Sequence, residues 1–307
     1  DYFLPTDAYL ETCAAVGAGF FSQRMNQLTC NARYMDEVER VLYNNVLTGV
    51  SLSGDKYTYQ NPLNTDKPDR WEWHVCPCCP PMFLKIMAAM PGYIYAYQGD
   101  NVYVNLFIGS EVRVPVGKSN SVRLKQLTSY PWHGAVSIQV NPDKASTFSM
   151  KVRIPGWAQG TENPYDLYQS NLKAPVKLKV NQEDVLLRIV DGYAEINREW
   201  KKGDHIELEL PMQPRLITAN KAVENLRGQV ALASGPIIYC FEDADNPELQ
   251  TFKLQAQTPL ELSHDSNLLN GVNIIKCQGD IPAKAIPYYA VANREESHSY
   301  KVWIPQK

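Results

Sequence analysis

The stretch WEWHVCPCCPPMFLKIMAAMPG at 71–92, followed by YIYAYQGDNVYVNLFIGSEVRVPVG at 93–117, marks the point where the chain changes from helix to sheet. In the first part a thiol-rich turn leads into Pro80-Pro81, which suits the start of a helix, and Pro91-Gly92 suits its end. In the second part apolar and polar residues alternate with a period of two, which is typical of strands. The sequence therefore predicts a helical part followed by a β part.

The residues before this point predict two helices and a loop. Apolar residues recur at intervals of three and four in ETCAAVGAGFFSQRMNQLT at 11–29 and in MDEVERVLYNNVLTGV at 35–50. These two helices are expected to pack as a hairpin. The polar segment SLSGDKYTYQNPLNTDKPDR at 51–70 is rich in Gly, Pro, Asn and Asp, and it predicts a long loop.

Alternating segments continue to the C-terminal end, and they predict antiparallel sheets. They fall into two sets, at 147–157, 175–181, 192–196 and 205–211, and then at 229–242, 251–255, 259–263, 272–277, 287–293 and 300–305. Two sets of short strands indicate two antiparallel β-sandwich domains. The fold class is mixed α and β, with expected domains at 1–94, 95–213 and 214–307.

The overall composition favours a charge-neutral partner. Among 307 residues, 30 Lys and Arg face 33 Asp and Glu, so the net charge of -3 gives no broad footprint for nucleic acid or an anionic membrane. No run approaches the roughly 20 apolar residues of a membrane helix. The 18 Tyr and 6 Trp offer flat faces with polar handles, which suit sugars or sheet surfaces. We therefore expect neither nucleic acid nor a membrane as partner; a homodimer, and a cytoplasmic or periplasmic location in a bacterium, are left open.

The cysteines suggest metal chemistry. Three of the seven lie in CPCC at 76–79, which is the wrong distribution for a disulfide scaffold. Zinc accepts thiolate and carboxylate ligands, so E-T-C at 11–13 and CPCC supply the candidate ligands Glu11, Cys13, Cys78 and Cys79. A helix start after Cys79 would stabilise a thiolate there. The alternative is that Cys13 and Cys79 are small buried hydrophobic residues.

Several ordered motifs resemble one known family. They are ETCA at 11–14, ARYMDEVERVLYNNVLTGVSLSG at 32–54, YQNPL at 59–63, CPCCPP at 76–81, IPGWA at 154–158, GQVALASGPIIYCFED at 228–243 and AIPYYAVANR at 285–294. Together they span essentially the whole chain. The sequence resembles the C-terminal part of the β-L-arabinofuranosidases of glycoside hydrolase family 127, which are related to family 146.

The resemblance implies a specific site and reaction. It implies that 1–94 ends an (α/α)6 barrel, that Glu11, Cys13, Cys78 and Cys79 bind Zn2+, and that Cys78 is the nucleophile of a retaining hydrolase. The substrate would be a terminal β-L-arabinofuranose, or a similar pentofuranose, on a plant glycan. The family's acid/base is a Glu upstream of E-T-C and outside this chain, so this chain alone is expected to be inactive or impaired.

Further residues carry weaker expectations. The resemblance places Glu39 and Tyr59 near the sugar, although Glu39 could equally be a solvated helix residue and Tyr59 a packing residue. His74 is expected to pack or to support the ligands more readily than to bind metal. Met82 and Lys85 stand where the family usually has Asn and Arg, and Val291 where Trp is common. These departures leave the sugar specificity open, because Lys lacks the planar fork of Arg.

Two other functions compete with hydrolysis. The chain could be a non-catalytic carbohydrate-binding or scaffold module whose zinc is structural, or CPCC could serve redox chemistry or zinc storage. The extensive β region argues against the second of these. Cys30, Cys240 and Cys277 are expected to be structural, since the last two fall in strand patterns that are typically buried.

Overall fold

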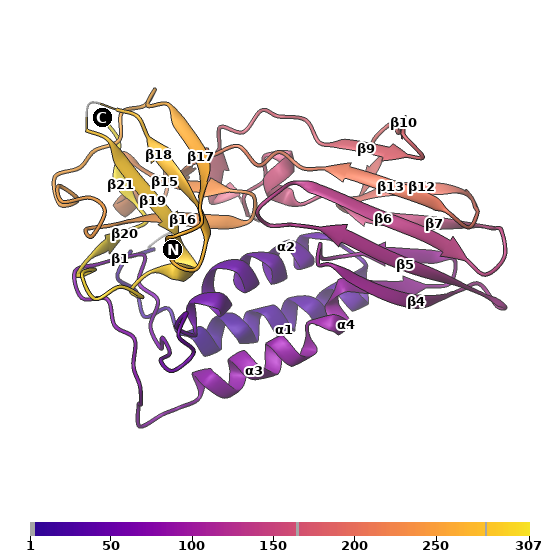
Figure 1. Cartoon of the computed structure of the whole chain (residues 1–307), viewed down its shortest axis with the longest axis horizontal. Coiled ribbons are helices and arrows are strands. Elements are labelled where there is room, and N and C mark those ends of the chain that lie inside the picture. The colour runs from indigo at the N-terminus through magenta and orange to yellow at the C-terminus, as the bar shows by residue number, and fades with distance from the viewer. Residues whose placement is uncertain (1–3, 164–165, 280) are drawn as a thin grey trace.

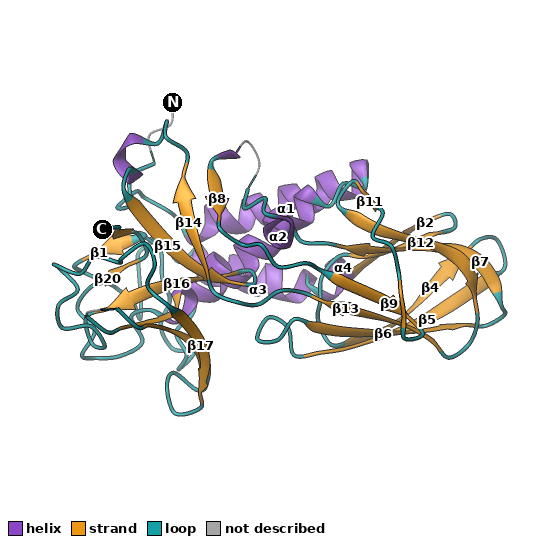
Figure 2. Ribbon diagram, turned by 90° about the horizontal axis from the view of Figure 1, so that it is seen from above, coloured by secondary structure: helices purple, strands orange, loops and turns teal. Residues whose placement is uncertain are grey.

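The computed structural model describes residues 4–163, 166–279 and 281–307. Figure 1 shows three parts: a group of helices, a β-sandwich beside them, and a curled sheet near the C-terminus. The helices lie against both β parts, as the view from above also shows (Figure 2). Within the described residues, none of the helices combines the length and the apolarity that crossing a membrane requires.

The predicted helical part is present. Helix α1 (Thr12–Thr29) is followed by α2 (Arg33–Arg40), which continues as the π-helix η1 (Val41–Val46), and then by α3 (Cys79–Ala89) and α4 (Pro91–Ile94). The helix predicted at 35–50 therefore starts earlier and widens at Val41. These helices share a core that includes Val16, Met35 and Ile86.

Two sheets form the middle sandwich. A six-stranded sheet in the order β10-β9-β13-β6-β5-β4 packs on a five-stranded sheet in the order β11-β12-β7-β3-β2. The pairing of β3 with β7 is parallel, whereas all other described pairs in these two sheets are antiparallel. The strands are β2 (Tyr95–Gln98), β3 (Asn101–Val104), β4 (Ser110–Val116), β5 (Asn120–Thr128), β6 (Ala135–Pro142), β7 (Ser146–Arg153), β9 (Lys177–Val180), β10 (Glu183–Asp184), β11 (Ile189–Val190), β12 (Tyr193–Trp200) and β13 (Asp204–Glu209).

The C-terminal sheet is one curled, ten-stranded sheet. Its main path is β17-β18-β19-β16-β15-β14-β8, and β20, β21 and β1 join it at the side. Two packed cores line it. The strands are β1 (Asn64–Thr65), β8 (Tyr168–Ser170), β14 (Arg215–Ala219), β15 (Gln229–Ser234), β16 (Ile237–Glu242), β17 (Leu260–Asp265), β18 (Val272–Cys277), β19 (Ala283–Pro287), β20 (Tyr300–Lys301) and β21 (Ile304–Pro305).

Two predicted strands are wrong. Residues 251–255 are largely irregular, with a single bridge from Leu254 to Gln306, and 287–293 passes from β19 into the 3-10 helix Tyr288–Ala290. The boundary expected after residue 94 falls between α4 and β2. Strand β1 lies in the expected domain 1–94 and β8 in the expected domain 95–213, yet both pair within the C-terminal sheet. The three parts of the chain therefore interlock.

Candidate metal centre

Two helix starts bring the candidate ligands together. Glu11 is extended (φ -72°, ψ 136°) and precedes α1, and Cys13 lies in the first turn of that helix. Cys78 precedes α3 and Cys79 is its first residue, with proline following as predicted. The start of α1 is fixed to the loop by the hydrogen bond from Thr12 N to the backbone oxygen of Tyr59 (3.0 Å).

The four candidate donor atoms form one compact group. One ligand atom from each of Glu11, Cys13, Cys78 and Cys79 lies within 4.8 Å of all the others. Cys13 Sγ is 3.5 Å from Cys79 Sγ, and Cys78 Sγ is 3.9 Å from Cys79 Sγ. Cys78 Sγ also lies 3.5 Å from Glu11 Oε1. Residues 65 or more positions apart in the sequence thus converge on one point.

These spacings can be compared with what zinc requires. A tetrahedral ion bound to sulfur at about 2.3 Å holds its ligand atoms about 3.8 Å apart. The closest contacts in the cluster, 3.5 to 3.9 Å, are near this value. Three thiols and one carboxylate are also a donor set that zinc accepts. The residues present therefore fit a zinc ion.

The three thiols differ in acidity. Burial raises the pKa of Cys79 to about 11 and raises that of Cys13 well above its ordinary value. Burial acts in the same direction on Cys78, but hydrogen bonds from Cys13, Tyr59 and the other nearby thiols lower the pKa of Cys78 below its usual range. Cys78 is therefore the thiol most easily converted to a thiolate, which is the nucleophilic form.

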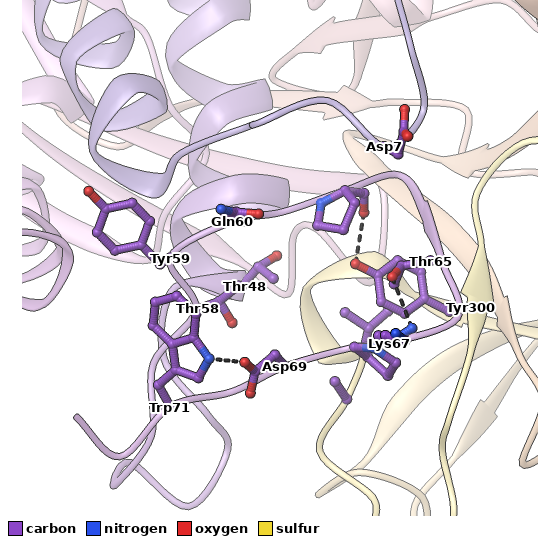
Figure 3. Close-up of a pocket in the computed structure, with 14 residues that line it drawn as sticks. Asp7, Thr48, Thr58, Tyr59, Gln60, Thr65, Lys67, Asp69, Trp71 and Tyr300 are labelled. Carbon is purple, nitrogen blue, oxygen red and sulfur yellow. Dashed lines mark hydrogen bonds between the residues drawn. The ribbon is translucent and has the colours of Figure 1, made fainter. Parts of the chain in front are cut away.

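Aromatic side chains form a wall on one side of the cluster. Tyr59 is buried, and its hydroxyl lies 3.7 Å from Cys78 Sγ. The Tyr59 ring packs 5.8 Å from Trp71 and 5.0 Å from His74. His74 stacks on Trp71 (4.4 Å, 14°), and it is not one of the four grouped donors. Behind this wall, Tyr59 and Trp71 also line a cavity of about 280 Å³ (Figure 3).

Glu39 lies elsewhere, in the contact between α2 and the middle sandwich. Its side chain is 1% exposed. Both carboxylate oxygens accept hydrogen bonds from Arg153, and further donors are Tyr130 (2.8 Å) and Trp157 (3.2 Å). A carboxylate with its acceptor positions engaged in this way is a structural anchor. The expected contact of Glu39 with a sugar stays a prediction, and what the structure shows is its role in this buried contact.

The other residues singled out from the sequence lie outside the group of four candidate donors. Cys240 and Cys277 are buried in strands, as expected, and Cys30 is the left-handed residue that ends α1 (φ 52°). Lys85 lies over the ring of Phe20 (5.2 Å). Val291 is 2% exposed and lines the cavity behind Trp71.

Sequence reasoning singled out Tyr59 but missed the other residues that support the cluster. Tyr57 and Tyr59 pack with Cys79 in a small buried cluster, with Trp71 against them. Arg70 donates hydrogen bonds to the backbone oxygen of Thr48, which precedes the loop in the sequence, and to those of Tyr289 and Val291 in the C-terminal part. The aromatic residues of the loop were a usable signal, because Tyr57, Tyr59 and Trp71 all precede the cysteine motif within one short stretch of sequence. Nothing in the local sequence singles out Arg70.

Comparisons with known proteins agree along the chain. Residues 1–92 match the catalytic domain of β-L-arabinofuranosidase, family 127, residues 101–212 match the middle domain, and residues 214–305 match the C-terminal domain of that family. A non-reducing end β-L-arabinofuranosidase from Bifidobacterium longum subsp. longum is 31% identical over 346 residues, covering 96% of this chain and 49% of that protein.

Solved structures show the same relationship. A family 127 β-arabinofuranosidase superimposes with a TM-score of 0.93 and 36% identity, over 100% of this chain and 51% of the other. A family 127 β-L-arabinofuranosidase from Geobacillus stearothermophilus superimposes with a TM-score of 0.91 and 34% identity, over 100% of this chain and 52% of the other. The chain thus spans about half the length of these relatives. On this evidence the chain belongs to glycoside hydrolase family 127, the family of the β-L-arabinofuranosidases.

Proposed function

We propose that this chain supplies the zinc site and the nucleophile of a retaining glycoside hydrolase. The sugar released would be a terminal β-L-arabinofuranose, or a similar pentofuranose, of a plant glycan. The observation that carries the proposal is the convergence of four donor atoms within 4.8 Å at two helix starts. The activity printed for the relative from Bifidobacterium longum supports the choice of sugar.

In this proposal Glu11, Cys13, Cys78 and Cys79 hold the zinc ion. When bound, zinc supplies positive charge that keeps coordinating thiols deprotonated at neutral pH. Cys78 starts from the lowered pKa and is half-buried, whereas Cys79 is buried. Cys78 therefore combines thiolate character with access to a substrate. Glu11 serves as a ligand and not as the acid/base.

The reaction would proceed in two displacements. Cys78 Sγ attacks the anomeric carbon, so that a carbon–sulfur bond forms as the bond to the leaving-group oxygen breaks, and that oxygen takes a proton from a Glu outside this chain. Water, deprotonated by the same Glu, then attacks the anomeric carbon and releases Cys78 as a thiolate. Two inversions give net retention of configuration.

Tyr59 would contact the substrate in this arrangement. Its hydroxyl lies 3.7 Å from Cys78 Sγ, so it can donate a hydrogen bond to the thiolate or to a sugar hydroxyl next to it. The ring is held by Trp71 and His74, and this fixes the position of the hydroxyl. We do not assign a substrate contact to Glu39.

The stereochemistry of the product tests the mechanism. In the protein that includes the upstream barrel, hydrolysis of p-nitrophenyl β-L-arabinofuranoside should release β-L-arabinofuranose first, which NMR can follow before mutarotation. Retention is expected because two displacements occur at one carbon. An α product at early times would contradict the covalent route. Binding of the glycoside without any hydrolysis would instead favour a carbohydrate-binding module.

A further inference from the structure

The loop that carries the cysteine motif has little regular structure of its own. Residues 51–77 contain only the two-residue strand β1 and isolated bridges, among them those of Tyr57 with Val50 and with Trp71. The loop ends at Cys78, so its position determines where that thiol lies. Helix α3 packs on α1 and so places Cys79, whereas the loop before Cys78 depends on contacts with other parts of the chain.

The C-terminal sheet holds the first half of the loop by strand pairing. Strand β1 pairs with β20, and Val302 N donates to the backbone oxygen of Leu63 (2.8 Å). The hydroxyl of Tyr300 donates to the backbone oxygen of Pro62 (2.7 Å). These bonds fix residues 62–65, which lie well before the cysteines.

Packing does not hold the second half in the same way. A cavity of about 280 Å³ lies between Trp71 and Tyr300 (Figure 3). Val291 and Ala292 also line it. Hydrogen bonds make the connection to the C-terminal part in this half of the loop: an exposed one from Gln250 to Asp66 (2.8 Å), and partly buried ones nearer Trp71.

Arg70 makes the partly buried hydrogen bonds. Its Nε and Nη2 donate to the backbone oxygen of Val291 (3.0 and 2.9 Å), and Nη2 also lies 3.3 Å from the backbone oxygen of Tyr289. Its Nη1 donates to the backbone oxygen of Thr48, next to the end of the second helix (2.8 Å). Burial lowers the pKa of Arg70 to about 10, so the side chain stays charged at neutral pH and these bonds are charge-assisted.

Short contacts connect Arg70 with the thiols. The next residue, Trp71, exchanges two backbone hydrogen bonds with Tyr57 (2.8 and 2.9 Å). The ring of Trp71 packs on Tyr59, whose hydroxyl lies 3.7 Å from Cys78 Sγ. A shift of Trp71 would move the wall that positions Cys78.

We propose that Arg70 is a positioning residue through which the C-terminal part holds the cysteine motif in its metal-binding geometry. The identity of the metal rests on the proposed function; the anchoring itself does not. Side chains that hydrogen-bond directly to a metal ligand typically change metal affinity by about 10- to 100-fold. Arg70 acts through Trp71 and Tyr59, so we expect an effect at the lower end of this range.

Arg70→Lys tests the proposal, with Arg215→Lys as its matched control. Both arginines donate to backbone oxygens, Arg70 from a partly buried and Arg215 from a buried position, but Arg215 pairs with Glu162 and bonds Gly235 rather than the cysteine loop. Lysine keeps the charge and loses the fork. Zinc affinity, measured by competition with a chelator, should fall at least about tenfold in Arg70→Lys and stay within about twofold in Arg215→Lys. Equal affinities in wild type and Arg70→Lys, or an equal loss in both variants, would overturn the proposal.

Hydrogen exchange in the metal-free protein supplies a readout that does not depend on zinc. The Trp71 amide, which donates to Tyr57, should exchange about tenfold faster in Arg70→Lys and at the wild-type rate in Arg215→Lys. An unchanged rate in Arg70→Lys would overturn the anchoring. If wild type binds no zinc while this exchange effect is present, the proposed function fails and the anchoring stands.

Discussion

Under the proposed function, replacing Cys78 with alanine is expected to abolish hydrolysis in a protein that joins this chain to the upstream barrel that the resemblance implies. The variant loses the only atom that we assign to attack the anomeric carbon, and removal of an enzymatic nucleophile costs about 10⁴-fold or more in kcat. The measurement is kcat/KM on p-nitrophenyl β-L-arabinofuranoside, with zinc content determined on the same samples. Cys78 also lies in the donor group, so some loss of zinc is expected as well.

Cys76→Ala is the matched control for this substitution. Cys76 is exposed, lies two residues from Cys78 and is not among the four grouped donors. Its Sγ is 4.0 Å from the Tyr59 hydroxyl, so its removal should change kcat/KM by less than about tenfold. Near-normal activity in Cys78→Ala, or an equal loss in both variants, would exclude Cys78 as the nucleophile.

Glu39→Gln is expected to destabilise the protein strongly. The substitution removes the charge that faces Arg153, a side chain with no exposed surface that also pairs with Asp36 (2.6 Å). Breaking a buried ion pair from one side costs about 3–5 kcal/mol when the other charge is left unpaired, and Asp36 offsets part of that loss here. The thermal midpoint should still fall by at least about 3 °C, as calorimetry can measure.

Glu37→Gln provides the comparison on the same helix. Glu37 pairs with Arg40 near the surface, with side chains 29% and 35% exposed. Such pairs contribute about 0.2–1 kcal/mol, so the thermal midpoint should hardly move. If Glu39→Gln instead kept its thermal midpoint and lost hydrolysis in the longer protein, Glu39 would be a substrate contact, as the resemblance implied.

The order of helices and strands could be predicted because local patterns dominate it. The start of α3 follows from Pro80-Pro81, and β18 coincides with the alternating segment at 272–277. The segment at 251–255 also alternates but stays largely irregular, with one bridge from Leu254 to Gln306. Strands β1 and β8 are two or three residues long, so their pairing depends on tertiary contacts that no local pattern encodes.

The candidate ligands could also be predicted, but their surroundings could not. Thiols and a carboxylate at helix starts carry a chemical signature in the sequence, which is why Glu11, Cys13, Cys78 and Cys79 were singled out. The burial of Glu39 depends on Arg153, which lies 114 residues away. Arg70 acts through the backbone oxygens of Val291 and Tyr289. Every residue type has such an oxygen, so the sequence does not indicate which residues accept these hydrogen bonds.

The zinc content of the purified, reduced chain tests the central claim most directly. Elemental analysis should find one zinc per chain in wild type and in Cys76→Ser, and a loss of zinc in Cys78→Ser and Cys79→Ser, because only the latter two remove a grouped donor. Folded and reduced wild-type protein without zinc would contradict the account. The same would follow if all four proteins retained equal zinc, since the metal would then be held elsewhere.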